Sequence, residues 1–243
     1  MSRRLLIAAN WKMNVVPTGA LEKGSPYHPL SDIDIVVFPT FLDILECSTV
    51  GLMVGGQYGH PESQGAHTGD ISMAILKNIG CRYVLCGHSE RRASHGETDE
   101  FVAEQVAAAL EVGLHPIVCI GETWEDRKKK KEKAKVEEQL SLLSLGSDLT
   151  IAYEPVWAIS GGDPDKPAAT ADDSQQMHEF IRSLLPKDRQ EQTRILYGGS
   201  MKPENARELL NQEDIDGGLI GGASLDPKKF VEIVRIAEEL LMS

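Results

Sequence analysis

The stretch YVLCGHSERRASHGETDEFVAEQVAAALEVGLHPIVCI, residues 83–120, decides the fold. It holds two short apolar runs, at 83–86 and 116–120. Between them lies a helical pattern at 98–112 that is rich in Ala and Glu and ends at Gly113. Both runs are continuously apolar, which is typical of parallel strands covered on both faces. The stretch therefore predicts a strand–helix–strand unit with parallel strands.

The same alternation extends over all 243 residues. Six further apolar runs predict strands at 5–9, 35–38, 52–55, 150–153, 194–197 and 218–220. Helices are predicted at 71–79, at 170–185, and beginning at Pro203 and Pro227, because proline suits a first helical turn. Eight strands without a break in composition predict one domain, 1–243, folded as an α/β protein with a single (β/α)₈ barrel of parallel strands. Periodicity alone also allows an open, doubly wound sheet.

Two helical positions of this barrel look irregular. The segment 15–34 contains the helix breakers Pro17, Gly19, Gly24, Pro26 and Pro29. The segment 41–50 leaves room for only a short helix. We therefore expect the first and second helical positions to be shortened or irregular.

The formal net charge of −12 argues against a nucleic-acid-binding protein. It would also repel a phosphate ester, so a site for such a substrate needs local positive charge. A basic run at 126–138, DRKKKKEKAKVEE, interleaves Lys with Glu. We interpret it as the solvated face of the fifth barrel helix rather than as a basic patch.

The cysteines Cys47, Cys81, Cys86 and Cys119 form no C-x-x-C pair and no Cys/His cluster with zinc spacing. We interpret them as small buried residues in a reducing compartment. The N-terminal apolar run is too short for a signal peptide, and no stretch approaches the roughly 20 apolar residues of a membrane span. We therefore expect a cytoplasmic protein without a membrane partner.

Three reactive side chains directly follow predicted strands, where barrel enzymes build their sites. Lys12 can place its ammonium in the mouth of the barrel, and a helical turn opening at His88 would favour a neutral imidazole. Taken alone, each also fits a surface lysine or a structural histidine. Glu154 precedes the apolar Val156 and Trp157, which can shield its carboxylate from water. A base, an electrophile and a cation together suit proton transfer next to a carbonyl.

Glycine pairs follow the last two predicted strands. They are Gly198-Gly199, with Ser200 after them, and Gly221-Gly222. Paired glycines let backbone N–H groups approach an anion closely, and phosphate sites recur after strands 7 and 8 of such barrels. These positions indicate a phosphorylated ligand.

Seven stretches together make the chain resemble the triosephosphate isomerase family. In family order they are AANWKMN (8–14), GAHTGDIS (65–72), GHSERR (87–92), CIGET (119–123), AYEPVWAI (152–159), ILYGGS (195–200) and GGASL (221–225). The resemblance implies a barrel isomerase of glycolysis and gluconeogenesis that interconverts D-glyceraldehyde 3-phosphate and dihydroxyacetone phosphate through an enediolate. It implies no metal and no organic cofactor.

The resemblance also implies roles for the reacting groups. Glu154 would be the base that moves the proton between carbons, and His88 the neutral electrophile at the substrate oxygens. Lys12 would bind substrate and offset negative charge, with Asn10 supporting the same oxygens. Glu90 would organise Lys12 rather than react.

For the phosphate, the resemblance implies backbone contacts from Ser200, Gly221 and Gly222. A lid just after Trp157 would add the N–H of Gly161 or Gly162. The lid AISGGDPDKPAAT (158–170) is longer than the family's usual AIGTGK, which leaves that glycine open.

The family forms homodimers in which the loop containing Thr68 reaches the neighbour near its Lys12. Here His67 stands where an aromatic residue is usual, and Asp70 where Glu is usual. Two alternatives stay open. One is a phosphate-binding scaffold with weak catalysis, and the other is a different sugar-phosphate barrel enzyme such as a phosphoribosyl isomerase. The latter shares the double-glycine site but not NWK, GHSERR and YEPVW together.

Overall fold

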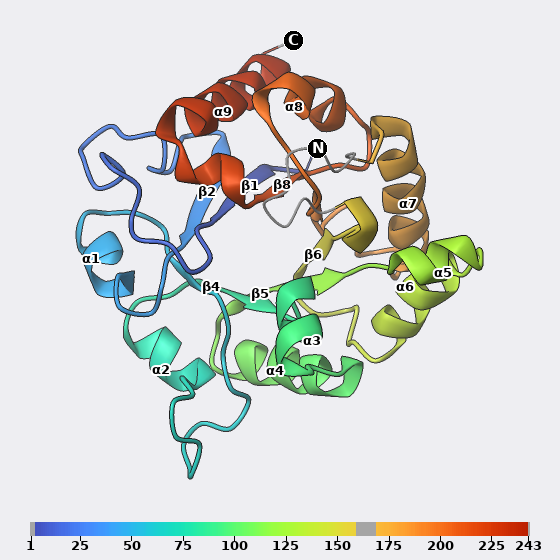
Figure 1. Ribbon diagram of the computed structural model, residues 1–243, viewed down its shortest axis with the longest axis horizontal. Coiled ribbons are helices and arrows are strands. Elements are labelled where there is room, and N and C mark those ends of the chain that lie inside the picture. Colours follow the sequence, from blue (N-terminus) through green and yellow to red (C-terminus); the bar gives the residue numbers. More distant parts are fainter. Residues whose placement is uncertain (1–2, 159–168, 243) are drawn as a thin grey trace.

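Eight parallel strands form a nearly closed barrel in the computed structural model, which describes residues 3–158 and 169–242 (Figure 1). The strands are β1 (Leu5–Asn10), β2 (Ile33–Phe38), β3 (Gly55–Gly56), β4 (Tyr83–Cys86), β5 (His115–Ile120), β6 (Thr150–Tyr153), β7 (Ile195–Tyr197) and β8 (Gly217–Ile220). β1 pairs with both β2 and β8. An isolated parallel bridge between Val37 and Val54 connects β2 to the residue just before β3. The predicted barrel is confirmed, and the open doubly wound sheet is excluded.

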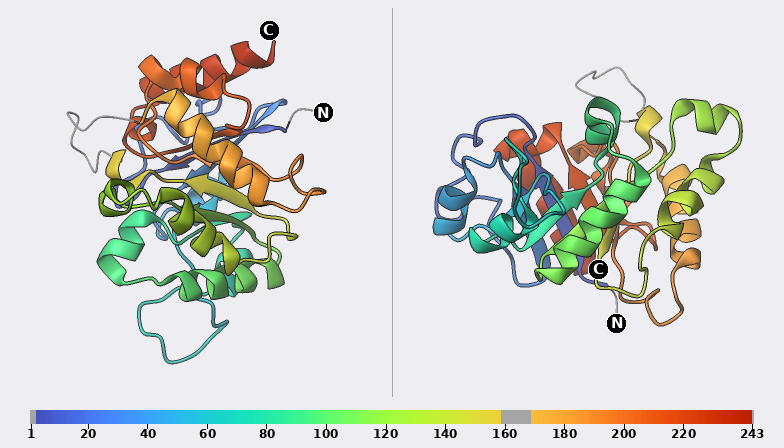
Figure 2. Two further views of the ribbon diagram at one scale, coloured as in Figure 1. Left: turned by 90° about the vertical axis from the view of Figure 1, so that its right-hand side faces the viewer. Right: turned by 90° about the horizontal axis from the view of Figure 1, so that it is seen from below.

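Helices surround the strands, as the views of Figures 1 and 2 show. They are α1 (Ile44–Thr49), α2 (Met73–Asn78), α3 (Ser89–His95), α4 (Asp99–Glu111), α5 (Trp124–Lys128), α6 (Glu132–Ser141), α7 (Ala171–Leu184), α8 (Pro203–Leu210) and α9 (Pro227–Leu241), with 3₁₀ turns η1 (Val156–Ala158) and η2 (Gly222–Leu225). The side chains of Ser72, Thr98 and Thr170 cap α2, α4 and α7. Pro203 and Pro227 open their helices as predicted. No helix in the described part of the chain is long and apolar enough to cross a bilayer.

The irregular helical positions are also confirmed, since 15–30 contains only turns and bends and α1 has six residues. Two elements differ from the simple expected pattern. The third strand was expected at 52–55, but regular pairing with β4 occurs at Gly55–Gly56. Glycine is required there because a Cβ on Gly55 would collide with the ring of Phe38, and glycines rarely indicate a strand. The fifth helix is broken into α5 and α6 around Lys130, whose φ is 55°.

The strand side chains alternate between two apolar regions. In β1, Leu6 and Ala8 join a cluster drawn from β2 and from β4 to β8, which fills the barrel interior. Ile7 and Ala9 instead belong to the larger layer between strands and helices. All four cysteines are free and buried, and burial raises the pKa of Cys81 to about 12. The strands are therefore apolar on both faces, as their sequences predict.

The buried His178 of α7 makes the stability of this fold depend on pH. Desolvation lowers its pKa from 6.5 to about 4, although its Nδ1 lies 3.1 Å from the carbonyl oxygen of Asp214. Between these two pH values the unfolded chain binds more protons than the folded chain, so stability falls as the pH drops from 6.5 to 4. The expected loss is about 3 kcal/mol.

Urea unfolding across this pH range checks the expectation with His178→Gln, which cannot take up the proton. In wild type, His178 takes up about one proton on unfolding in this range, and this uptake steepens the dependence of the unfolding free energy on pH. The variant should lack that contribution. His28→Gln removes a histidine elsewhere in the chain, and its unfolding free energy should depend on pH as in wild type. A His178→Gln profile parallel to wild type would contradict the assignment.

Candidate active site

A cavity of about 810 Å³ opens at the carboxyl ends of the strands. Its lining includes every predicted site residue that the structure describes, namely Asn10, Lys12, His88, Glu90, Glu154, Ser200, Gly221 and Gly222. They lie at or just beyond the carboxyl ends of β1, β4, β6, β7 and β8, so the barrel brings them together. The lid glycines Gly161 and Gly162 lie outside the described residues.

Lys12 has a backbone conformation that non-glycine residues rarely adopt, with φ of 52°. Its backbone N–H donates to Oδ1 of Asn10 (3.0 Å), and Gln57 Nε2 donates to its carbonyl oxygen (2.7 Å). Its Nζ donates to Oε1 of Glu90 at 2.5 Å. The neighbouring residues thus fix both the backbone and the ammonium of Lys12. Sequence reasoning missed Gln57, although it is a polar residue directly after β3.

Glu90 is held in its charged form by Lys12. Burial alone would raise the pKa of Glu90, but the hydrogen bond and the charge of Lys12 outweigh burial and hold that pKa below its ordinary value. The contact fixes the ammonium of Lys12 beside the cavity, where it can turn to an anionic molecule. Glu90 therefore lies where it can position Lys12, the role that the resemblance implies for it.

The imidazole of His88 is oriented by the start of α3. His88 is the N-cap of that helix, and its Nδ1 accepts a hydrogen bond from the backbone N–H of Glu90 at 3.2 Å. A nitrogen that accepts is unprotonated, so the ring proton belongs on Nε2. Nε2 lies 3.1 Å from Oε1 of Glu154 and lines the cavity.

Glu154 lies at the end of β6 with only 2% of its surface exposed. Its Oε2 accepts a hydrogen bond from the backbone N–H of Ser89 at 2.8 Å, a partner that sequence reasoning missed. The carboxylate therefore rests against the start of α3, next to His88. A carboxylate this close to an imidazole can exchange protons with a bound molecule, provided the molecule displaces these contacts.

The tautomer of His88 is a testable consequence of this geometry. We expect the neutral ring to carry its proton on Nε2, because the backbone N–H of Glu90 at the helix start donates to Nδ1. Nitrogen-15 NMR of labelled histidine distinguishes the two neutral tautomers and the doubly protonated ring. A ring protonated on Nδ1 would contradict the proposed direction of hydrogen bonding.

The glycines after β7 and β8 serve different purposes. A Cβ on Gly198 would lie 2.7 Å from Cγ of Glu154, and one on Gly221 would lie 3.1 Å from Cε of Lys12. Both glycines therefore leave room for reactive side chains. A Cβ on Gly222 would meet nothing within 4 Å, so packing does not require glycine there. The short η2 begins at Gly222 on the cavity wall, and the first N–H groups of a helical turn have no partner within that turn, so they suit an anion.

A buried network anchors the chain where the expected lid begins. Trp157 Nε1 donates to Oε1 of Glu122 (2.7 Å), and the hydroxyl of Tyr153 donates to its Oε2 (3.0 Å). Burial raises the pKa of Glu122 against the opposing effect of these donors. Arg127 lies 4.4 Å from the centre of the Trp157 ring. The sequence alone gave Glu122 no role, because nothing in the motif CIGET shows that this glutamate is buried.

Comparison with known proteins gives a consistent result. A sequence model of the family "Triosephosphate isomerase" matches residues 5–237. Three proteins named triosephosphate isomerase are similar to this chain over nearly the full length of both chains. The protein from Magnetococcus marinus is 45% identical, with 96% of this chain and 98% of the relative aligned. The corresponding values are 44%, 96% and 98% for Carboxydothermus hydrogenoformans, and 42%, 95% and 98% for Aquifex aeolicus.

Proposed function

The chain belongs to the triosephosphate isomerase family, and we propose that Glu154, His88 and Lys12 carry its reaction. That reaction interconverts D-glyceraldehyde 3-phosphate and dihydroxyacetone phosphate, as part of glycolysis and gluconeogenesis. Membership in the family excludes the phosphoribosyl isomerase considered above. The observation that carries the proposal is the meeting of Glu154 and His88 at 3.1 Å in a cavity that Lys12 also lines.

In the proposed mechanism the carboxylate of Glu154 takes a proton from the substrate carbon next to the carbonyl. The carbonyl oxygen accepts a hydrogen bond from Nε2 of His88, which releases the Glu154 contact seen without substrate. Charge moves onto that oxygen as the enediolate forms, and Lys12 stabilises it. The hydroxyl proton of the substrate moves from the neighbouring oxygen to this one, with Nε2 of His88 between the two oxygens, and Glu154 returns its proton to the neighbouring carbon. The overall change is thus an isomerisation without a cofactor.

The phosphate group is proposed to lie against Ser200, Gly221 and Gly222. The open space around Gly222 and the start of η2 support this position. Asn10 supports Lys12 through the backbone hydrogen bond, and we propose that its amide also reaches the substrate oxygens. A lid glycine, Gly161 or Gly162, is proposed to complete the contacts.

We further propose that the chain is one domain, 1–243, that works in the cytoplasm as a homodimer. Several large apolar side chains near the loops after β1 and β2 are exposed, with Met13 at 94%, Leu42 at 92% and Val15 at 85%. The loop containing Thr68 extends outward from the barrel (Figure 1). In a two-fold dimer, Thr68 of each chain would approach the Lys12 loop of the other, and the apolar residues would be covered.

Light scattering combined with a turnover assay on the same sample tests the dimer. Wild type should have the mass of a dimer at micromolar concentration. Thr68→Arg should produce a monomer with reduced turnover, because the charge cannot be buried without a partner. Ser183→Arg adds the same charge on the exposed face of α7 and should remain a dimer. A fully active wild-type monomer would contradict the role of this loop.

A further inference from the structure

Three lysines line the reaction cavity, and two of them have no acidic partner. They are Lys12, Lys202 and Lys229. The ammonium of Lys12 contacts Glu90, so these two opposite charges largely cancel at a distance. Lys202 and Lys229 are exposed, and neither forms an ion pair with any residue in 3–158 or 169–242. Within those residues their positive charges are therefore not offset by a paired carboxylate.

The starts of α8 and α9 place these two lysines beside the proposed phosphate position. Lys202 is the N-cap of α8 and follows Ser200 by two residues. The side chain of Asn205 accepts from the backbone N–H of Lys202 at 2.7 Å and donates to the carbonyl oxygen of Ser200 at 2.9 Å. Lys229 lies in the first turn of α9, which packs against α8 (Figure 1). Both lysines thus belong to the segments after β7 and β8 that carry the proposed phosphate contacts.

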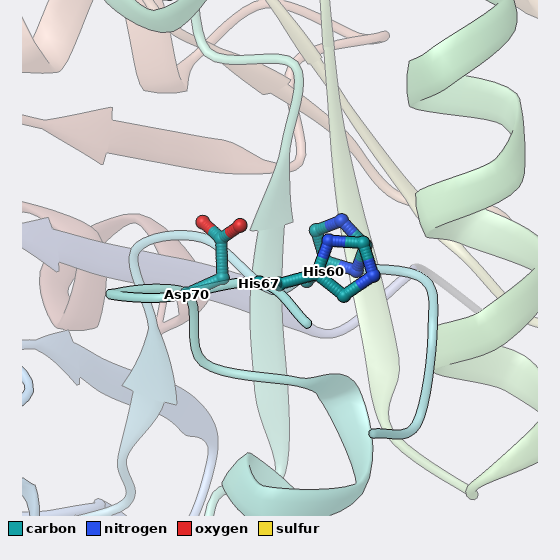
Figure 3. Close-up of side chains that lie close together, drawn as sticks. All are labelled: His60, His67 and Asp70. Atoms are coloured by element: carbon teal, nitrogen blue, oxygen red, sulfur yellow. The ribbon is translucent and has the colours of Figure 1, made fainter. Parts of the chain in front are cut away.

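The other titratable side chains near the cavity supply no comparable positive charge. Nδ1 of His88 accepts a hydrogen bond, so the ring is uncharged in this geometry. Glu154 and Glu204 line the cavity as carboxylates. His60 and His67 face each other on the separate loop between β3 and α2, and neither lines the cavity (Figure 3). Of the described lining residues, Lys202 and Lys229 therefore provide the positive charge that an approaching anion meets.

We propose that Lys202 and Lys229 are specificity-determining residues that draw a doubly charged phosphate ester into the cavity. The proposal rests on the reaction taking place in this cavity. A phosphate monoester carries about 1.5 to 2 negative charges at neutral pH, which two lysines match. Each ammonium ends a flexible stem, so it attracts the substrate through its field rather than through one fixed contact. In a chain with a net charge of −12, this local field opposes the general repulsion of anions.

Steady-state rates of the double variant Lys202→Met/Lys229→Met test the proposal, because methionine keeps an unbranched stem without the charge. At about 0.01 M salt kcat/KM should fall about tenfold, the lower end of the usual effect of electrostatic steering. The value of kcat should stay at the wild-type level, since neither lysine contacts the reacting atoms. At about 1 M salt the screening length shrinks from about 30 Å to about 3 Å, and the two enzymes should converge. Arginine at both positions keeps the charges and should preserve the wild-type salt dependence.

Glu204→Gln gives a test in the opposite direction. It removes a negative charge from the lining of the same cavity, so kcat/KM should rise at low salt, a gain that a damaged fold cannot produce. Lys187→Met is the control for net charge. Lys187 is exposed in the turn between α7 and β7, at the amino end of the strands, and its loss should leave kcat/KM unchanged.

Two results would overturn the proposal. One is a loss of kcat/KM in the double methionine variant that is equal at low and high salt, and the other is a lower kcat/KM in Glu204→Gln. Neither result bears on the proposed chemistry, which depends on the kcat of Glu154→Gln.

Discussion

Glu154→Gln is expected to lower kcat by at least about 10²–10⁴-fold, the usual contribution of a positioned general base. The amide has the shape of the carboxylate and can still accept the Ser89 N–H, but it cannot take a proton from carbon. Binding of the phosphate group should persist, because the proposed phosphate contacts come from the loops after β7 and β8. Steady-state rates in both directions, with the affinity for an unreactive phosphate ester, measure the two effects separately.

Glu179→Gln is the matched control, since it makes the same chemical change on the exposed face of α7. Its turnover should equal that of wild type. If Glu154→Gln retained activity within tenfold of wild type, Glu154 would have no place in the mechanism as the base.

Lys12→Met should weaken substrate binding and slow turnover together. In the proposed mechanism the ammonium contacts the substrate in the ground state and the greater oxyanion charge in the transition state. We therefore expect KM to rise and kcat to fall. Loss of one such group costs about 10²–10³-fold in kcat alone. The variant also leaves Glu90 without its partner, which adds a repulsive charge beside the cavity.

Lys228→Met separates this local effect from the change in net charge. Lys228 is exposed on α9 and does not line the cavity, yet its replacement removes the same single positive charge. It should leave kcat/KM close to wild type at moderate salt. Unchanged phosphate-ester affinity and turnover in Lys12→Met would show that another residue supplies the positive charge that acts on the substrate.

The sequence predicts the barrel, and it predicts that the candidate site residues meet at one end of the barrel, for a common physical reason. Continuous apolar runs indicate strands buried on both faces, and polar residues directly after such runs must meet at one end of a parallel barrel. Lys12, His88 and Glu154 were placed in one cavity by this rule. The helix starts at Thr98, Thr170 and Pro227 were equally readable, because capping is a local property.

Features that depend on tertiary contacts could not be predicted in this way. The positive φ of Lys12 is held by Gln57, a residue 45 positions away in the sequence. β3 consists of two glycines, chosen for the space taken by Phe38 and Leu76 rather than for strand propensity. Glu122 accepts hydrogen bonds from Trp157 and Tyr153, which the fold brings to it. In each case the feature depends on a contact with a residue that is distant in the sequence.

Isomerisation in deuterium oxide tests most directly whether Glu154 transfers the proton. A carboxylate base that holds the substrate proton between two carbons should exchange part of it with solvent. We predict that wild type forms product carrying deuterium at the carbon next to the carbonyl, and that Glu154→Gln slows this incorporation as much as it slows turnover. Deuterium incorporation by Glu154→Gln at the wild-type rate, or wild-type product entirely free of solvent deuterium, would contradict the account.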